Sequence, residues 1–185
     1  MTELAALSEE VGVSERTLRR AVGQGALRAA RPTERTLHVP YTERRYIRRS
    51  WSTLAALRAA LRTERNVRLA VLFGSAARGS DNAESDLDVL VALCDPSLER
   101  VVDLSLKLTE LTGRRADVVR REDVESEPSF LLDVVTDGRV LVDRDGLWPE
   151  LLARETQLRH RAHRRQKTRA QAALAGIDRL LNARA

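Results

Sequence analysis

The sequence predicts a mixed α/β (α+β) protein whose small mixed sheet is preceded by short helices and followed by a long C-terminal helix. Two observations support this fold class. In the middle of the chain, apolar stretches of strand length alternate with amphipathic helical patterns, which favours a layered sheet and helix core. At both ends, apolar residues recur only at helical spacing.

Charge divides the 185-residue chain into three parts, although the net charge is only +5. Residues 1–65 hold 13 basic and 7 acidic side chains, residues 66–146 hold 10 and 17, and residues 147–185 hold 9 and 3. Basic ends suit a phosphate backbone or an acidic protein, whereas an acidic centre suits metal ions. The order therefore predicts modules with different partners.

Hydropathy and cysteine content predict a cytoplasmic protein with no membrane partner. No apolar run approaches the roughly 18 residues that a membrane span needs, and no signal peptide opens the chain. Cys94 is the single cysteine, so no internal disulfide forms. Its place at the end of an apolar stretch predicts a small buried side chain.

The first part is expected to contain a small domain over residues 1–40 and a linker helix over residues 41–65. Gly12 and Gly25 are expected to end two short helices, and Ser14 is a favourable N-cap between them. A loose hairpin is expected over residues 27–39. The predicted inner positions of the three helices are Leu4, Leu7, Val11, Leu18, Ala21, Val22, Ile47, Trp51, Leu54, Leu57 and Leu61.

The core is expected over residues 66–146 and a helical tail over residues 147–185. Strands are predicted at 67–73, 87–93, 116–119 and 140–142, the last at a sheet edge, and helices at 97–112 and 128–136. The predicted buried face of helix 97–112 consists of Leu98, Val101, Val102, Leu104, Leu108 and Leu111. The apolar positions of the tail, expected to be one helical region, are Leu151, Leu158, Leu174, Ile177 and Leu181.

Chemistry is concentrated in Gly74-Ser75 and, after ten residues, Asp86-Leu87-Asp88. A strand that ends in Gly-Ser offers backbone N–H groups and a hydroxyl to an anion, because glycine allows a phosphate close to the backbone. Asp86 and Asp88 are two apart on a strand, so both leave the same face. Two carboxylates at about 4 Å repel by about 4 kcal/mol at an effective dielectric near 20. A hard cation, Mg²⁺ or Mn²⁺, would relieve this repulsion.

Asp117 is the third candidate carboxylate. It lies in a strand-like stretch that could pair beside the strand of Asp86. Three carboxylates around two metal ions about 3.5–4 Å apart form a recurring arrangement for phosphoryl transfer. The bland alternative is that these acids belong to an ordinary surface and that Gly74-Ser75 is an ordinary turn.

Together these residues resemble the nucleotidyltransferase superfamily that includes DNA polymerase beta, in its minimal form. The resemblance covers about residues 66–146 and implies transfer of a nucleoside monophosphate from ATP or another nucleoside triphosphate to a hydroxyl. It implies that Asp86 and Asp88 bind both metal ions, and that Asp117 binds the catalytic ion and helps deprotonate the acceptor. The implied nucleotide-binding residues are Gly74, Ser75, Arg78 and Ser85.

The small core also resembles antitoxins that adenylylate a tyrosine of a helical toxin of the HEPN class. The resemblance implies a HEPN-type toxin as partner, because a protein acceptor brings its own surface to a core that has few walls. A homodimer stays open. So do two alternative functions: a DNA-binding regulator with a nucleotide-sensing domain, and a small-molecule (antibiotic-type) nucleotidyltransferase.

The N-terminal order of helix, glycine turn, helix and hairpin resembles winged helix-turn-helix proteins such as the MerR-like regulators. The match runs from Val11 to Arg20 and continues at Gly25-Ala26-Leu27. With Leu18 and Val22 anchoring the second helix, its arginines would face DNA phosphates or guanine edges. Protein contact is the alternative use of this basic surface. The predicted DNA-binding residues are Arg16, Arg19, Arg20, Arg28, Arg31 and Arg35.

Overall fold

A computed structural model describes residues 3–30 and 37–182 of the chain, without the side chains of residue 172 and residues 175–182. Arg31 and Arg35, which were predicted to contact DNA, lie outside the described residues, as do the side chains of Ile177 and Leu181. The elements follow in the order α1 (Glu3–Glu10), α2 (Glu15–Gly23), α3 (Tyr41–Thr63), β1 (Val67–Phe73), α4 (Gly74–Arg78), β2 (Leu87–Leu93), α5 (Leu98–Thr112), β3 (Ala116–Arg120), η1 (Arg121–Val124), α6 (Pro128–Asp137), β4 (Arg139–Asp143), α7 (Leu147–Ala153) and α8 (Glu155–Asn182).

The strands that the structure describes form one four-stranded mixed sheet in the order β3-β2-β1-β4. β1 pairs antiparallel with β2 and with β4, while β2 and β3 run parallel. The predicted mixed fold is confirmed, including the edge position of the last strand. The parallel pair needs a crossover, which α5 supplies.

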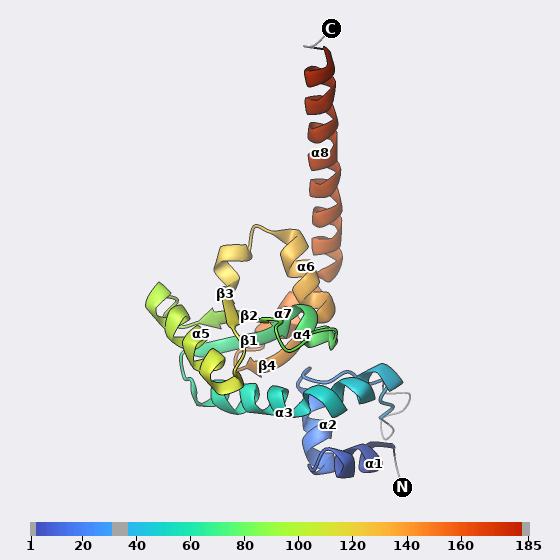
Figure 1. Cartoon of the computed structure of the whole chain (residues 1–185), viewed down its shortest axis with the longest axis vertical. Helices are drawn as coiled ribbons and strands as arrows, with labels where there is room; N and C mark the ends of the chain where they lie inside the picture. The colour runs from blue at the N-terminus through green and yellow to red at the C-terminus, as the bar shows by residue number, and fades with distance from the viewer. Residues whose placement is uncertain (1–2, 31–36, 183–185) are drawn as a thin grey trace.

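Helices cover both faces of this sheet (Figure 1). Because successive strand residues point to opposite faces, Leu72 of β1 packs into the core under α3 and α5, and Val71 packs into the core with α6, α7 and the first turns of α8. The sheet is therefore buried on both sides. Side chains that must meet a ligand have to lie at its ends.

The N-terminal helices join the same core as the sheet. Leu7 of α1, Leu18 of α2 and Leu57 of α3 belong to one buried cluster with Leu72 and Val89. Ser14 caps α2 as expected, since its Oγ accepts a hydrogen bond from the N–H of Thr17 at 3.1 Å. Ala30 and His38 form an antiparallel bridge. The helix expected as a linker is thus part of this core, with buried side chains from Tyr46 to Leu61.

The buried face predicted for α5 is partly wrong. Val101, Leu104 and Leu108 are buried, but Leu98 and Val102 are exposed, as is Leu111. At 3.6 residues per turn, positions 101, 104 and 108 share one stripe, and positions 98 and 102 lie on another side of the helix. The helix carries apolar side chains on more than one side, so residue type alone does not reveal which side packs against the core. The prediction of a buried Cys94 is also wrong, because that side chain is exposed just after β2.

The C-terminal region consists of two helices instead of one. A break at Arg154 separates α7 from α8, which allows Trp148 and Leu151 of α7 and Leu158 of α8 all to enter the second core. Beyond its first turns α8 projects from the body of the protein (Figure 1), and Leu174 on it is exposed. Among the described residues, no helix combines the length and the apolar content that crossing a bilayer demands.

Candidate active site

The strand register brings two of the predicted acids together at one end of the sheet. Asp88 is the Cα partner of Asp117 across the parallel pair β2–β3 and of Phe73 across β1–β2. Leu87 and Ala116 point into the core under α3 and α5, so their neighbours Asp88 and Asp117 point to the opposite face. Asp86 lies two residues before Asp88, just outside β2, one residue short of the strand position expected for it.

Gly74 lies directly against the central acid. Its φ of +70° is a left-handed conformation, and a Cβ built on it would lie 2.3 Å from Oδ2 of Asp88. Glycine therefore meets two demands here, because it adopts this conformation without strain and leaves room for a carboxylate beside the backbone. The backbone at the start of α4 thus comes close to the Asp88 carboxylate of β2.

The acids form a site whose negative charge is only partly compensated. Burial raises the pKa of Asp88, and the carboxylates of Asp117 and Asp86 raise it further, against an opposing effect of Arg78. Neither Asp86 nor Asp88 has a hydrogen bond or an ion pair with any residue that the structure describes. Asp117 is paired through Oδ1 with Nε of Arg115 at 3.0 Å. A cation bound beside these three carboxylates would relieve their mutual repulsion.

The chemistry of these side chains fits a divalent metal ion with a preference for hard oxygen ligands. Within residues 3–30 and 37–182, however, no group of three or more His, Cys, Asp and Glu side chains is gathered closely enough to hold a metal ion. The pairing of Asp117 with Arg115 gives one reason, since that carboxylate has a partner other than a metal. The metal-binding roles of Asp86, Asp88 and Asp117 stay a prediction.

The remaining predicted nucleotide-binding residues lie around α4 and in the loop before β2. Ser75 is the second residue of α4, directly after Gly74. Arg78 pairs with Asp137 of α6, with NH1 2.6 Å from Oδ2, and lies close enough to Asp88 to lower its pKa. Ser85 donates its hydroxyl to Oδ1 of Asn82 at 2.9 Å, within its own loop. Arg78 thus lies beside the acids, while Ser85 shapes the loop that leads to them.

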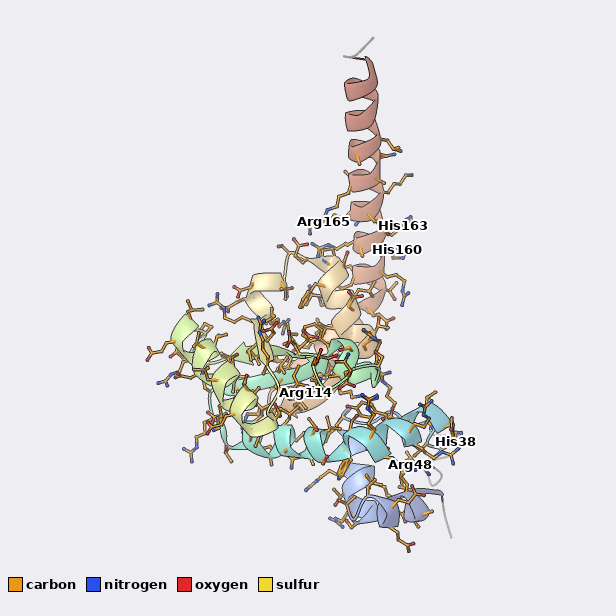
Figure 2. The ribbon with its side chains drawn as sticks, viewed as in Figure 1. His38, Arg48, Arg114, His160, His163 and Arg165 are labelled. Carbon is orange, nitrogen blue, oxygen red and sulfur yellow. The ribbon has the colours of Figure 1, made fainter. Side chains whose placement is uncertain are left out.

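Sequence reasoning missed the residues that fix this loop. Arg114, which precedes β3 (Figure 2), donates Nε to the carbonyl oxygen of Ser85 at 2.9 Å and pairs NH1 with Asp81 at 2.7 Å. Arg49 of α3 donates NH1 to the carbonyl oxygen of Gly79 at 3.0 Å and approaches the same Asp81. These side chains hold the backbone of the loop that leads to Asp86. No local pattern reveals them, because their partners are far away in the sequence.

Of the predicted DNA-binding arginines that the structure describes, three lie on α2, and the fourth reaches the last residue of α6. Arg16, Arg19 and Arg20 are exposed on α2, and Arg19 pairs with Glu15 one turn earlier. Arg28 instead donates NH2 to the carbonyl oxygen of Asp137 at 2.6 Å. Its guanidinium is therefore engaged within the protein, which the sequence did not reveal.

A fold of this kind, with acids at the end of a mixed sheet beside a glycine-serine turn, defines a nucleotidyltransferase. The family model described as polymerase beta, nucleotidyltransferase matches residues 56–146. A relative from Thermococcus cleftensis, protein adenylyltransferase MntA, is 37% identical over 76 residues, which are 40% of this chain and 77% of that relative. A relative from Methanocaldococcus jannaschii is 40% identical over 79 residues, 38% of this chain and 74% of its own length. The chain belongs to the polymerase beta nucleotidyltransferase family and is an enzyme of that class.

Solved structures share the fold at low sequence identity. A chain from a crystal structure of a toxin–antitoxin with AMP-PNP has a TM-score of 0.54 and 19% identity, covering 65% of this chain and 98% of that one. A chain from a structure of a tri-AMPylated Shewanella oneidensis HEPN toxin in complex with MNT antitoxin has a TM-score of 0.52 and 16% identity, covering 68% and 98%. The shared fold thus spans nearly the whole of these chains and about two thirds of this one.

Proposed function

We propose that this enzyme transfers AMP from ATP to a hydroxyl of a partner protein, with Mg²⁺ or Mn²⁺, as the antitoxin of a pair whose toxin is of the HEPN type. One observation carries the chemistry: Asp88 is in register with Asp117 and lies against Gly74, where burial and two neighbouring carboxylates raise its pKa. The relative named protein adenylyltransferase supports the donor and the kind of acceptor. A cytoplasmic location stays part of the proposal.

In this reaction the acceptor oxygen forms a bond to the α-phosphorus of ATP, and the bond from that phosphorus to the bridging oxygen of pyrophosphate breaks. Asp117 accepts the hydroxyl proton on a carboxylate oxygen and releases it to solvent. Asp86 and Asp88 would hold the divalent ions, and Gly74 and Ser75 would hold the β- and γ-phosphates, with Arg78 and Ser85 beside them. When bound, the ions would supply charge neutralisation on the triphosphate and a lower pKa for the attacking hydroxyl.

The acceptor is proposed to be a protein because the chain contributes few walls to the site. Residues 66–146 form the predicted core, and among residues 3–30 and 37–182 no second domain lies over the acids at its end. A small acceptor would need surrounding side chains to orient it, whereas a folded partner presents a hydroxyl from its own surface. The toxin–antitoxin structures with the same fold support this kind of partner.

The test is to incubate the full chain with ATP, Mg²⁺ and the helical protein encoded beside it, and to weigh both proteins by mass spectrometry. We expect the partner to gain the mass of one or more AMP units, and an Asp86→Asn enzyme to add none. A partner of unchanged mass would contradict the proposal. Turnover of ATP with a small hydroxyl compound and no protein would instead favour the small-molecule alternative.

A second function, DNA binding, is proposed for the domain predicted over residues 1–40. The observation that favours it is the exposure of Arg16, Arg19 and Arg20 on α2, following an N-cap at Ser14. Arginines that neutralise phosphates release counter-ions, so such binding weakens steeply with salt. An antitoxin with this property would repress its own operon.

Gel-shift titration of the promoter upstream of the gene tests this second function. We expect sequence-selective binding that Arg16→Gln weakens and Asp86→Asn leaves unchanged, with affinity falling as salt rises. Equal affinity for unrelated duplexes would contradict a regulatory role.

A further inference from the structure

A cavity of about 600 Å³ lies between α2 and α3, away from the acidic edge. Its volume is in the range of about 300–1,000 Å³ that small-molecule sites occupy. Both helices contribute basic side chains to it, and α3 adds an indole ring. The residues that define this basic groove are Arg16, Arg19, Arg20, Trp51, Arg58 and Arg62.

The arginines of the basic groove lack carboxylate partners, with one exception. Arg19 pairs with Glu15. The other four make no ion pair with any residue that the structure describes. Gln24 accepts hydrogen bonds from both Arg58 and Arg62 at Oε1, but a neutral amide cannot balance two guanidinium charges. The groove therefore concentrates positive charge that nothing in it neutralises.

Arg58 makes the imbalance most evident because it is buried, with 6% of its surface exposed. Its NH1 donates to the carbonyl oxygen of Val140 at 2.7 Å, and burial together with the charge of Arg62 lowers its pKa to about 10. The other buried arginine of comparable depth, Arg139, is paired through two hydrogen bonds with the carboxylate of Glu43. A buried guanidinium without an acid is costly unless an anion binds beside it.

We propose that the basic groove binds a compact phosphate-rich anion, of the class of nucleoside polyphosphates, at a site separate from the catalytic acids. Guanidinium groups match phosphate oxygens through paired hydrogen bonds. The groove offers them from two helices facing each other. Trp51 lines the same cavity, and an aromatic ring there adds an apolar wall beside the charges.

A free anion fits the groove better than a DNA backbone does. The exposed arginines of α2 are accessible to a duplex, but Arg58 and Trp51 have only 6% and 9% of their surfaces exposed. A duplex is too wide to reach side chains that lie this deep, whereas a short phosphate chain can enter the groove. The two ligands therefore differ in their dependence on α3. The compact anion requires Arg62 of α3, whereas the proposed DNA binding does not.

The test is calorimetric titration of the full chain with sodium tripolyphosphate and, separately, ATP, both in EDTA. Without metal ions the catalytic acids repel these anions, so failure of this site and failure of the proposed catalysis are distinguishable. The variants are Arg20→Gln and Arg62→Gln, both at exposed positions. The matched control is Arg164→Gln, which removes one exposed arginine from α8, far from the groove.

We expect both anions to bind, with affinity reduced at least about tenfold by Arg20→Gln and by Arg62→Gln, and less than twofold by Arg164→Gln. Equal losses in all three variants would mean a nonspecific charge effect and would overturn the proposal. So would the absence of binding to either anion. Binding of a DNA duplex that Arg20→Gln weakens, that Arg62→Gln leaves intact and that tripolyphosphate does not compete for would assign these arginines to DNA alone.

Discussion

The acidic edge of the sheet and the basic groove between α2 and α3 present the same electrostatic problem with opposite signs. At the edge, Asp88 lies near two other carboxylates and its pKa is raised. In the groove, Arg58 lies near Arg62 and its pKa is lowered to about 10. In each region burial and like charge disfavour the ionised form, and neither Asp88 nor Arg58 forms an ion pair with a residue that the structure describes.

A third region shows that this protein also buries charge in a balanced way. Arg139 and Glu43 are 2% and 4% exposed, and they meet through hydrogen bonds of 2.6 and 2.9 Å. Arg139 also donates to the carbonyl oxygen of Ala77 and lies over the ring of Tyr46. We infer from this difference that a buried charge paired within the chain, such as Arg139, stabilises the fold. Buried or half-buried charges without an ion pair, such as Arg58 and Asp88, indicate a ligand-binding surface.

The largest expected effect follows from removing the central acid. Asp88→Asn should lower the rate of nucleotide transfer at least about 1,000-fold, because it removes a carboxylate proposed to hold the divalent ions that would neutralise charge on the reacting phosphate. The measurement is the initial rate of AMP incorporation into the partner. Asp133→Asn is the matched control, since that exposed acid of α6 lies outside the edge, and it should retain nearly full activity. A comparable loss in both variants would remove the distinction between the edge and an ordinary acidic surface.

Breaking the buried Arg139–Glu43 pair should lower the stability of the protein, in contrast to a change at the acidic edge. Glu43→Gln leaves Arg139 buried without a carboxylate, and breaking such a pair costs about 3–5 kcal/mol. Urea denaturation measures this loss. The matched control is Glu10→Gln, which breaks an exposed pair with Arg48 and should change the midpoint little. If Glu43→Gln were as stable as the parent protein, the buried pair would not be the structural counterpart of the two uncompensated regions.

The third comparison is between two glycines with a left-handed backbone, of which only Gly74 lies close to Asp88. Gly74→Ala should lower activity about 100-fold, since a displacement near 1 Å at the reacting groups has an effect of that size. A Cβ there meets Oδ2 of Asp88, whereas at Gly113, with a similar φ of +66°, it meets nothing within 4 Å. Gly113→Ala should therefore lose only stability, about 1–3 kcal/mol from the left-handed backbone. Rates measured on both variants decide the matter, and equal activities would mean that Gly74 has no special contact with the acids.

Prediction from the sequence succeeded where the information was local. The strands around Asp88, the cap at Ser14 and the helical stripe through Leu54 and Leu57 follow from short-range periodicity and residue type. The spacing from Gly74 to Asp88 was equally informative, because the pairing of β1 with β2 brings the two ends of their connection together.

Prediction failed where the partner is distant in the sequence. Arg114 holds Ser85 across 29 positions, and Arg28 reaches the carbonyl oxygen of Asp137 across 109. The basic groove likewise needs α2 and α3 side by side. Leu98 of α5 illustrates another limit, since an apolar residue on a helix reveals nothing of its exposure until the packing face is known.

The smallest expected effect is on stability without metal, and it tests whether the acidic edge is prepared for a cation. A carboxyl whose pKa is raised by folding stabilises the protein below its ordinary pKa of about 3.9, and this contribution is lost as pH rises through the higher folded value. Asp88→Asn in EDTA at pH 7 should therefore melt at the parent temperature or slightly above it, by at most about 2–4 °C, because solvent screens a carboxylate that is partly exposed.

This test measures the melting temperatures of Asp88→Asn and of the parent protein against pH in EDTA. The measurement is then repeated with Mg²⁺ in place of EDTA. The difference between the two proteins should vanish below about pH 4, where Asp88 of the parent is protonated. Mg²⁺ should raise the melting temperature of the parent and leave the variant nearly unchanged, since a ligand stabilises only the state that binds it. A variant markedly less stable than the parent in EDTA would mean that Asp88 supports the fold, and the contrast between balanced and uncompensated charge would no longer separate structure from function.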